Sequence, residues 1–180
     1  LVVLRIDPKT LVSVVDAKLR EWGVEECNFT YDMQGIGQYF KGFFKDAVPF
    51  NNQAAPIAQS HQEEEGIKYL YKDLKSQCAW LFYKMIKDRK ISIEPSLLER
   101  KYSGNGFSKV PLRQILQKER KMLRRDENSE GKGFKLLPKK VAKKYVGHSP
   151  DFFESWFYVM IFSLTKKKNK KVKGLWMLSR

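Results

Sequence analysis

The chain is poor in the residues that build disulfide frameworks and zinc sites, with two cysteines and two histidines among its 180 residues. Cys27 falls on a predicted buried strand and Cys78 on a predicted helix, and neither has partners at zinc spacing. No secretory leader is recognisable. We therefore expect both cysteines to be core thiols of a protein in a reducing compartment.

The sequence also lacks glycine-rich nucleotide-binding loops and segments that could span a membrane. The sequence has no G-x-x-x-x-G-K-[ST] phosphate loop, and Phe40 stands where a dinucleotide fingerprint starting at Gly35 needs its third glycine. The apolar stretch 152–164 is interrupted by Glu154 and is too short to cross a bilayer. It predicts a buried core helix, with Trp156 and the aromatic residues that follow it in the core.

Positive charge is abundant and unevenly distributed. The formal net charge is +15, but residues 1–65 hold six Lys and Arg against ten Asp and Glu, whereas residues 66–180 hold 29 against ten. Clustered Lys and Arg are typical of polyanion binders, because neutralised phosphates release their counterions. The charge favours nucleic acid as the partner, with a solvated basic face or an anionic membrane contact as alternatives.

Hydrophobic patterning predicts one α/β domain over residues 1–164 and a frayed basic tail over 165–180. A strand at 1–6, a helix at 10–22 and a strand at 27–32 favour a parallel strand pair. The other predicted elements are strands at 47–50, 91–93 and 134–137, helices at 38–44, 67–89, 110–125 and 138–145, and a flexible joint at 103–108. The helix at 67–89 is predicted to bury one stripe of side chains: Leu70, Leu74, Ala79, Phe82 and Ile86.

Two acidic motifs lie at opposite ends of the chain, at 31–37 and 147–154. The first ends a predicted strand in a glycine turn, which places Asp32 at a strand tip, where ligand sites of α/β sheets collect. The second predicts a helix start with Ser149 as N-cap and Pro150 at the first helical position, so that Asp151 and Glu154 share one face. The structural alternatives are a turn aspartate and acids that favour the helix dipole.

Carboxylates inside a strongly basic protein suit phosphodiester cleavage by two divalent ions about 4 Å apart. We therefore predict that Asp32 and Asp151 lie in one metal-binding cleft and hold Mg²⁺ or Mn²⁺. Lysines at four-residue spacing just before the second motif suit phosphate contacts, although a solvated face is an equal alternative. These predicted nucleic-acid-binding residues are Lys139, Lys140, Lys143 and Lys144. His148 is interpreted as an exposed capping or surface residue, with the tuning of a metal-bound water as the alternative, and His61 is assigned no role.

The two motifs and the Asn-Asn segment at 51–52 resemble the C-terminal nuclease domain of phage terminase large subunits. The order and rough positions match that family along most of the chain. The resemblance implies a ribonuclease-H-like mixed sheet flanked by helices, with Asp32 and Asp151 as catalytic metal ligands. Glu154 stands where that family often has Asp, and the resemblance implies an auxiliary ligand or a carboxylate behind the ligands.

The resemblance also implies partners: double-stranded DNA, a terminase small subunit and a portal protein, with no membrane. It places the protein in the host cytoplasm and transiently at the procapsid portal. The family's first catalytic Asp lies on a strand before the glycine turn, and Asp7 has the wrong topology for that role. We expect that strand and the family's ATPase motor to lie upstream of Leu1, so that the site within residues 1–180 is incomplete and its nuclease activity weak or absent.

Two other classes of function fit the sequence. One is a non-catalytic nucleic-acid-binding module, in which the acids are structural and residues 66–180 bind the polyanion. The other is a different ribonuclease-H-like nuclease or recombinase. Divalent-metal titration separates the binding module from either enzyme.

Overall fold

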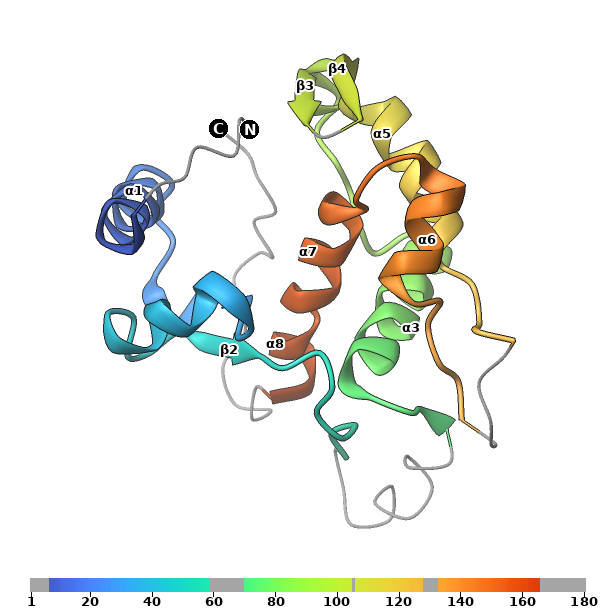
Figure 1. Cartoon of the computed structure of the whole chain (residues 1–180), viewed down its shortest axis with the longest axis horizontal. Coiled ribbons are helices and arrows are strands. Elements are labelled where there is room, and N and C mark those ends of the chain that lie inside the picture. The colour runs from blue at the N-terminus through green and yellow to red at the C-terminus, as the bar shows by residue number, and fades with distance from the viewer. Residues whose placement is uncertain (1–6, 59–69, 105, 128–132, 166–180) are drawn as a thin grey trace. The chain divides into compact units, whose positions relative to one another are not determined.

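A computed structural model of the chain describes residues 7–58, 70–104, 106–127 and 133–165. The described elements form a mixed α/β structure whose sheets are two separate strand pairs. The chain divides into two compact units, the first ending at Asn52 and the second beginning at Gln53 (Figure 1). The predicted strand at 1–6, His61 and the tail from 166 onward lie outside the described residues.

In the N-terminal unit, helix α1 (Pro8–Glu21) confirms the helix predicted at 10–22 and begins two residues earlier. The reason is Asp7, whose carboxylate accepts hydrogen bonds from the backbone N–H groups of Lys9 (3.0 Å) and Thr10 (3.1 Å). Pro8 fits the first helical position because its missing N–H has no partner there in any case.

The parallel pair of this unit joins β1 (Thr30–Asp32) to β2 (Val48–Phe50), with Asp32 opposite Phe50. The 3₁₀ helix η2 (Gly35–Gly42) lies between these strands in sequence and replaces the helix predicted at 38–44. A further 3₁₀ turn, η1 (Glu26–Asn28), occupies the start of the strand predicted at 27–32. Cys27 therefore lies on an exposed turn, and the prediction of a buried thiol there is wrong.

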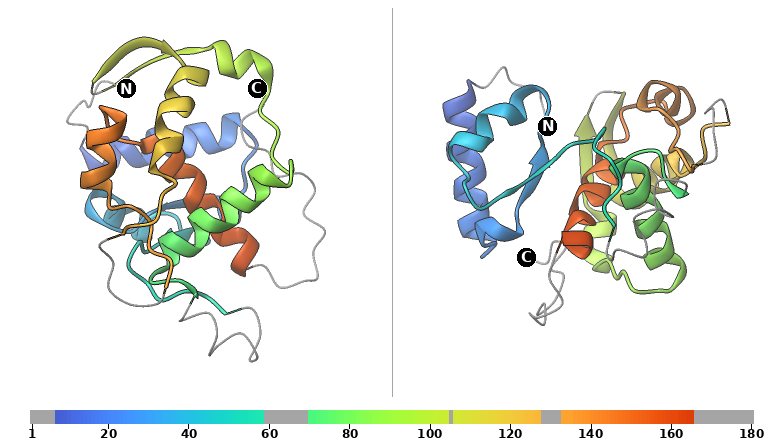
Figure 2. Two further views of the ribbon diagram at one scale, coloured as in Figure 1. Left: turned by 90° about the vertical axis from the view of Figure 1, so that its right-hand side faces the viewer. Right: turned by 90° about the horizontal axis from the view of Figure 1, so that it is seen from below.

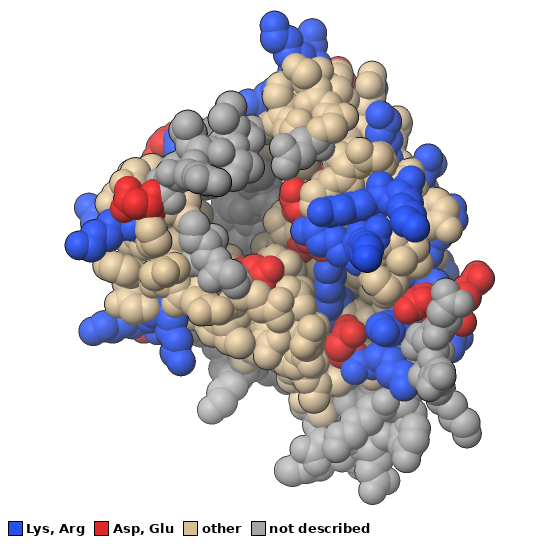
Figure 3. Space-filling model, viewed as in Figure 1, with Lys and Arg blue, Asp and Glu red and all other residues tan. Residues whose placement is uncertain are grey.

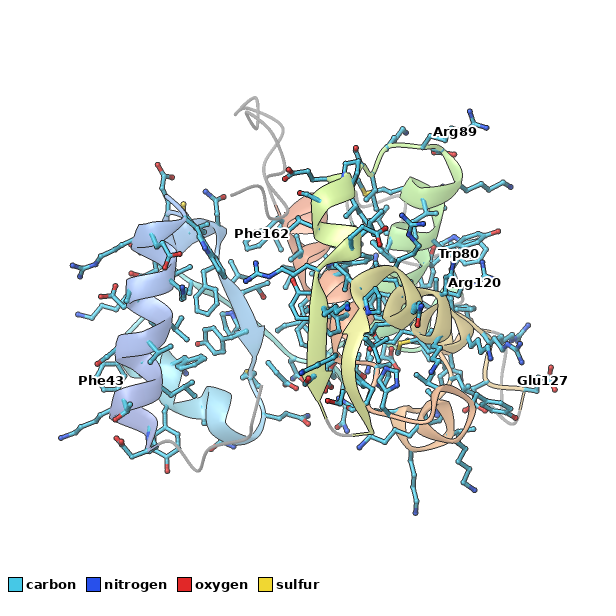
Figure 4. All side chains as sticks on the ribbon, turned by 90° about the horizontal axis from the view of Figure 1, so that it is seen from above. Phe43, Trp80, Arg89, Arg120, Glu127 and Phe162 are labelled. Atoms are coloured by element: carbon cyan, nitrogen blue, oxygen red, sulfur yellow. The ribbon has the colours of Figure 1, made fainter. Side chains whose placement is uncertain are left out.

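The core of the N-terminal unit is mainly aromatic. In Figure 4 its ring side chains fill the space between α1 and β1. Edge-to-face contacts connect the rings, with centroids 5.3 Å apart between Tyr31 and Phe40 and 5.5 Å between Phe40 and Phe44. The residues buried in this core are Val12, Tyr31, Phe40, Phe44 and Ala47.

In the C-terminal unit, helix α3 (Leu74–Lys87) starts later than the helix predicted at 67–89. Asp73 caps it by accepting from the N–H of Ser76 (2.7 Å), and Tyr71 before it makes a β-bridge with Phe134. Leu74, Ala79 and Phe82 are buried as predicted, whereas Leu70 and Ile86 are exposed. Cys78 is buried as predicted, and its burial raises the pKa of the thiol to about 12.

A β-hairpin replaces the flexible joint predicted at 103–108. After the short helix α4 (Pro95–Glu99), β3 (Lys101–Gly104) pairs antiparallel with β4 (Phe107–Pro111), which leads into α5 (Leu112–Glu119). Gly106 in the turn has φ +95°, and a Cβ there would lie 2.8 Å from the carbonyl oxygen of Gly147. The turn thus needs glycine both for its backbone and for close packing. Residues 91–93, predicted as a strand, form none.

The rest of the unit is helical. The helix predicted at 110–125 is α5 followed by the 3₁₀ turn η3 (Arg120–Met122), and the one predicted at 138–145 is confirmed as α6 (Lys139–Val146). The helix predicted at 152–164 is divided at Met160 into α7 (Asp151–Val159) and α8 (Ile161–Thr165). Residues 134–137, predicted as a strand, make isolated bridges instead.

Helices α3 and α7 pack side by side in both views of Figure 2. Phe82 of α3 is fully buried, with its ring centroid 5.6 Å from that of Phe153 and 5.7 Å from that of Phe157. Trp156 also contacts Phe82 (5.3 Å), so the predicted core packing is confirmed for Trp156 and Phe157. This packing fixes the axis of α7, whose first turn carries Asp151 and Glu154.

Candidate functional site

Asp32 stands at the C-terminal end of β1, as predicted. Beyond it, the N–H of Met33 still donates to the carbonyl of Phe50 (2.9 Å), which keeps the ends of the two strands together. The Asp32 carboxylate accepts from the N–H of Gln34 (3.0 Å) and from the side-chain amide of Asn52 (3.3 Å). Because the strands are parallel, residues that follow each strand meet at the same edge, where α/β sheets hold ligands.

Close packing explains the second glycine of the turn. A Cβ at Gly37 would overlap the carbonyl oxygen of Asp32, so only glycine allows η2 to fold back on the end of β1. A Cβ at Gly42, at the other end of η2, would meet nothing within 4 Å. The close contact at Gly37 therefore holds the end of β1, at Asp32, in place.

From the sequence, Asn52 was noted only as part of the Asn-Asn segment at 51–52, without a role of its own. Its Oδ1 is buried and has no hydrogen-bond partner among the described residues, while its Nδ2 donates to Asp32. A buried unpaired oxygen costs roughly 1–3 kcal/mol, so such a group is suited to binding an ion or a water molecule. The feature of the sequence that pointed to Asn52 was its position two residues after β2, the strand that pairs with β1.

In the C-terminal unit, α7 begins at Asp151, but its start differs from the prediction. Ser149 is not the N-cap: Pro150 occupies that position, and the Ser149 hydroxyl donates instead to Asp151 Oδ1 (2.7 Å). The buried Glu119 of α5 satisfies the first turn by accepting from the N–H of Phe153 (2.8 Å). The carboxylate of Glu119, 34 residues from Phe153 in sequence, thus accepts a hydrogen bond from the first turn of α7, a role that was predicted for the Ser149 side chain.

Asp151 and Glu154 share one face of α7, as predicted, and Lys139 of α6 reaches both. Its ammonium lies 2.9 Å from Asp151 Oδ1 and in close contact with Glu154 Oε2. Partial burial would raise the pKa of Asp151, but hydrogen bonds from Ser149 and Lys139 outweigh it and lower that pKa. Burial would lower the pKa of Lys139, and its bonds to Glu154 and Asp151 instead raise it.

Glu154 is buried and paired on both oxygens. Its side chain is 5% exposed, and Lys75 of α3 contacts Oε1 at 2.5 Å while Lys139 contacts Oε2. Asp151, by contrast, is 68% exposed. Of the two acids, Asp151 is the one that solvent and a ligand can reach.

The four predicted DNA-binding lysines fall into two groups. Lys139 is half-buried in the ion pairs above, whereas Lys140, Lys143 and Lys144 are exposed on α6. Figure 3 shows Lys and Arg side chains gathered over this helix. Arg124, whose guanidinium lies 5.8 Å from the ring centroid of Tyr145, adds positive charge beside it. The exposed group is the one suited to a polyanion.

His148 is buried, and the prediction of an exposed residue is wrong. Its Nε2 lies 3.1 Å from Glu119 Oε1, and its ring packs against Phe107 at 4.7 Å. Burial raises the pKa of Glu119 to about 7 and lowers the pKa of His148. Both shifts favour a neutral pair in which the Glu119 hydroxyl donates to His148 Nε2. The pair connects α5 to the segment before α7.

In the N-terminal unit, the carboxylate of Asp32 and the amide oxygen of Asn52 are hard donors of the kind that Mg²⁺ and Mn²⁺ prefer, and the Asn52 oxygen, unpaired among the described residues, fits such an ion. Within the described ranges, no three His, Cys, Asp or Glu side chains are grouped so as to hold a metal ion. Asp32 belongs to the N-terminal unit and Asp151 to the C-terminal unit.

Comparison with protein-family models, curated proteins and solved structures finds no match to this chain. Among the described helices, none is long and apolar enough to cross a membrane.

Proposed function

We propose that this chain is a divalent-metal-dependent endodeoxyribonuclease with a ribonuclease-H-like fold, like the nuclease domain of phage terminase large subunits. The observation that carries the proposal is the Asp32 carboxylate at the C-terminal end of a parallel strand pair, beside the unpaired oxygen of Asn52. Ligand sites of α/β sheets collect at this edge, and both groups are hard oxygen donors.

The resemblance of the second motif makes Asp151 a further proposed metal ligand. It is exposed, it begins α7, and its lowered pKa keeps it ionised at neutral pH. In this proposal both acids are ligands of Mg²⁺ or Mn²⁺, and Asn52 orients Asp32. The ions, when bound, supply an activated water and stabilise the leaving oxygen of the phosphodiester.

Lys140, Lys143 and Lys144 bind the DNA backbone in this proposal. Lysines on one helix contact phosphates without reading bases, so cutting is expected to tolerate many sequences. Concatemeric viral DNA as the substrate, and a terminase small subunit and portal protein as partners, follow from the resemblance of the two motifs and belong to the same proposal.

Mn²⁺ binding followed by electron paramagnetic resonance tests the proposal. Asp32→Asn and Asp151→Asn should each lower Mn²⁺ affinity about tenfold or more, because each removes a charged ligand. Any nicking of supercoiled DNA in Mn²⁺ should fall with it, while DNA binding is kept, and the Mn²⁺ affinity decides the test if the wild type shows no nicking. Asp16→Asn and Asp88→Asn are matched controls, since they remove the same charge at exposed positions, one in each unit.

A non-catalytic nucleic-acid-binding module is the second candidate, favoured by the lysine pairs that compensate Asp151 and Glu154. Its signature is DNA binding without Mn²⁺ binding. Mn²⁺ affinity that neither Asp32→Asn nor Asp151→Asn lowers would contradict the nuclease proposal.

A further inference from the structure

Tyr145 is an exposed aromatic residue on a basic surface. It lies in the last turn of α6 and is 55% exposed. The residues that bury α6 against the rest of the unit are Ala142 and Val146, both small or medium-sized and apolar. Core packing therefore does not explain a large ring at position 145.

The positive charge of this surface comes from two segments that pack against each other, α6 and η3. Within residues 117–125, which include η3, the one acid is Glu119, and it is buried. The exposed charged side chains of that stretch are all basic: Lys118, Arg120, Lys121, Arg124 and Arg125. The exposed lysines of α6 are Lys140, Lys143 and Lys144. Cations that can meet phosphates thus lie on both segments that adjoin the ring.

Arg124 connects the ring to this charge. Its guanidinium carbon lies 5.8 Å from the ring centroid of Tyr145, which is within cation–π range. Its backbone carbonyl accepts from the N–H of Leu137 (2.9 Å), just before α6 begins, so the segment that carries the guanidinium is tied to the helix that carries the ring. Aromatic rings and guanidinium planes are the groups on which unpaired bases stack.

Ion pairs at its first residue fix α6 in place. Lys139 is paired with the buried Glu154 and with Asp151, both in the first turn of α7. A buried carboxylate is stable only when it is paired, so this contact holds the start of the helix. A ring on a fixed helix loses little freedom when a ligand binds to it.

We propose that Tyr145 and Arg124 form a stacking site for an unpaired base of single-stranded DNA, whose phosphates bind the lysines of α6. This inference rests on the DNA-binding part of the proposed function, deepens it by naming the form of DNA, and needs no metal ion. In a duplex the faces of the bases are covered by their neighbours, whereas a base of a single strand can turn onto the ring. Stacking uses the face of a base and not its edge, so the site tolerates many sequences.

The experiment measures DNA binding of the full chain by fluorescence anisotropy in EDTA. The three probes are an oligothymidylate, an abasic strand with the same phosphates and a duplex, each about 12 nucleotides long, as suits known single-strand sites. Tyr145→Ala should weaken oligothymidylate binding about tenfold, as expected for one base on one ring, and change binding of the other two probes less than about twofold. Tyr145→Phe keeps the ring and should bind as the wild type does.

Tyr39→Ala and Tyr83→Ala are the matched controls, because each removes an exposed tyrosine, one in each unit, 56% and 40% exposed. Neither should weaken oligothymidylate binding. Thermal unfolding of every variant follows folding. If Tyr145→Ala fails to fold, Tyr145→Leu serves in its place, because it keeps an apolar side chain and has no ring.

The contrary outcomes are distinguishable. Oligothymidylate binding that Tyr145→Ala leaves unchanged, or that Tyr145→Phe weakens equally, overturns the inference and leaves the proposed nuclease standing. An equal loss on the abasic strand or the duplex, or in Tyr39→Ala, also overturns it, since base stacking on this ring would then not be the cause. No binding of any probe by the wild type overturns the DNA-binding part of the proposed function and the inference with it.

Discussion

The two units hold the acids of the two motifs in different ways. In the N-terminal unit, the Asp32 carboxylate accepts hydrogen bonds from neutral groups, the backbone of Gln34 and the amide of Asn52. In the C-terminal unit, Asp151 and Glu154 are paired with the ammonium groups of Lys139 and Lys75. A backbone N–H and a side-chain amide help to orient the first carboxylate, whereas ammonium groups both orient the other two and compensate their charge.

The largest expected effect concerns the backbone geometry around Asp32. Gly37→Ala should destabilise the protein by about 3 kcal/mol, because the added methyl group overlaps the carbonyl of Asp32 and forces η2 away from β1. Urea unfolding measures the change. Gly42→Ala is the matched control, since open space surrounds that position. Equal stability of the two variants would show that η2 does not hold the strand end.

A second expected effect concerns the buried pair of the C-terminal unit. The pKa of Glu119 is raised to about 7 from an ordinary 4.5, so the stability that it contributes is present below pH 4.5 and lost as pH rises through 7. The pKa of His148 is lowered, so its contribution has the opposite sign: it is present above pH 6.5 and lost as pH falls.

Glu119→Gln separates the two contributions. The amide stays neutral, can donate to His148 and can accept from the N–H of Phe153, so the shape of the site is kept. Relative to the wild type, this variant should gain on the order of 2 kcal/mol between pH 5 and pH 8. Chemical unfolding at both pH values measures the gain. Glu99→Gln, on exposed α4, shows how much general charge loss contributes; a pH-independent difference for Glu119→Gln would refute the neutral pair.

The smallest expected effect concerns the exposed lysines of α6. Replacing Lys140, Lys143 and Lys144 with Ala should weaken DNA binding to all sequences alike and flatten the salt dependence by about 2 to 3 in slope, near one unit for each lost phosphate contact. Fluorescence anisotropy over a salt series measures it. Replacement of Lys84, Lys87 and Lys90 with Ala removes the same charge from the exposed end of α3 and the residues that follow it. Equal losses in both triple variants would assign DNA binding to net charge and not to α6.

Local patterns predicted the elements whose causes are local. The helix at 10–22 has a capping aspartate, a proline and a glycine at its ends, and the helix at 138–145 follows a proline, so both were found. Asp151 and Glu154 lie on one face because they are three residues apart. The hairpin at 101–111 was missed, although its Asn-Gly pair is a common hairpin signal.

Burial was predicted less well, because it depends on what packs against each residue. Leu70 and Ile86 fit a helical stripe, yet both side chains are exposed: Leu70 lies before the β-bridge residue Tyr71 and outside α3, and Ile86 lies in the last turn of α3. Cys27 reads as part of an apolar strand, but strand pairing starts beyond it, at Phe29. Periodicity describes one segment and says nothing about the segment that covers it.

The sequence by itself determined the basic character of the second part of the chain, the strand-end position of Asp32 and the common face of Asp151 and Glu154. These follow from composition and from spacings of a few residues. Only the tertiary structure decided that Asn52 lies against Asp32, that Glu119 and His148 form a buried pair and that Lys139 separates from the other lysines of α6. The partners in those contacts are 20, 29 and 12 or 15 residues apart, and chain folding alone brings such residues within hydrogen-bond distance.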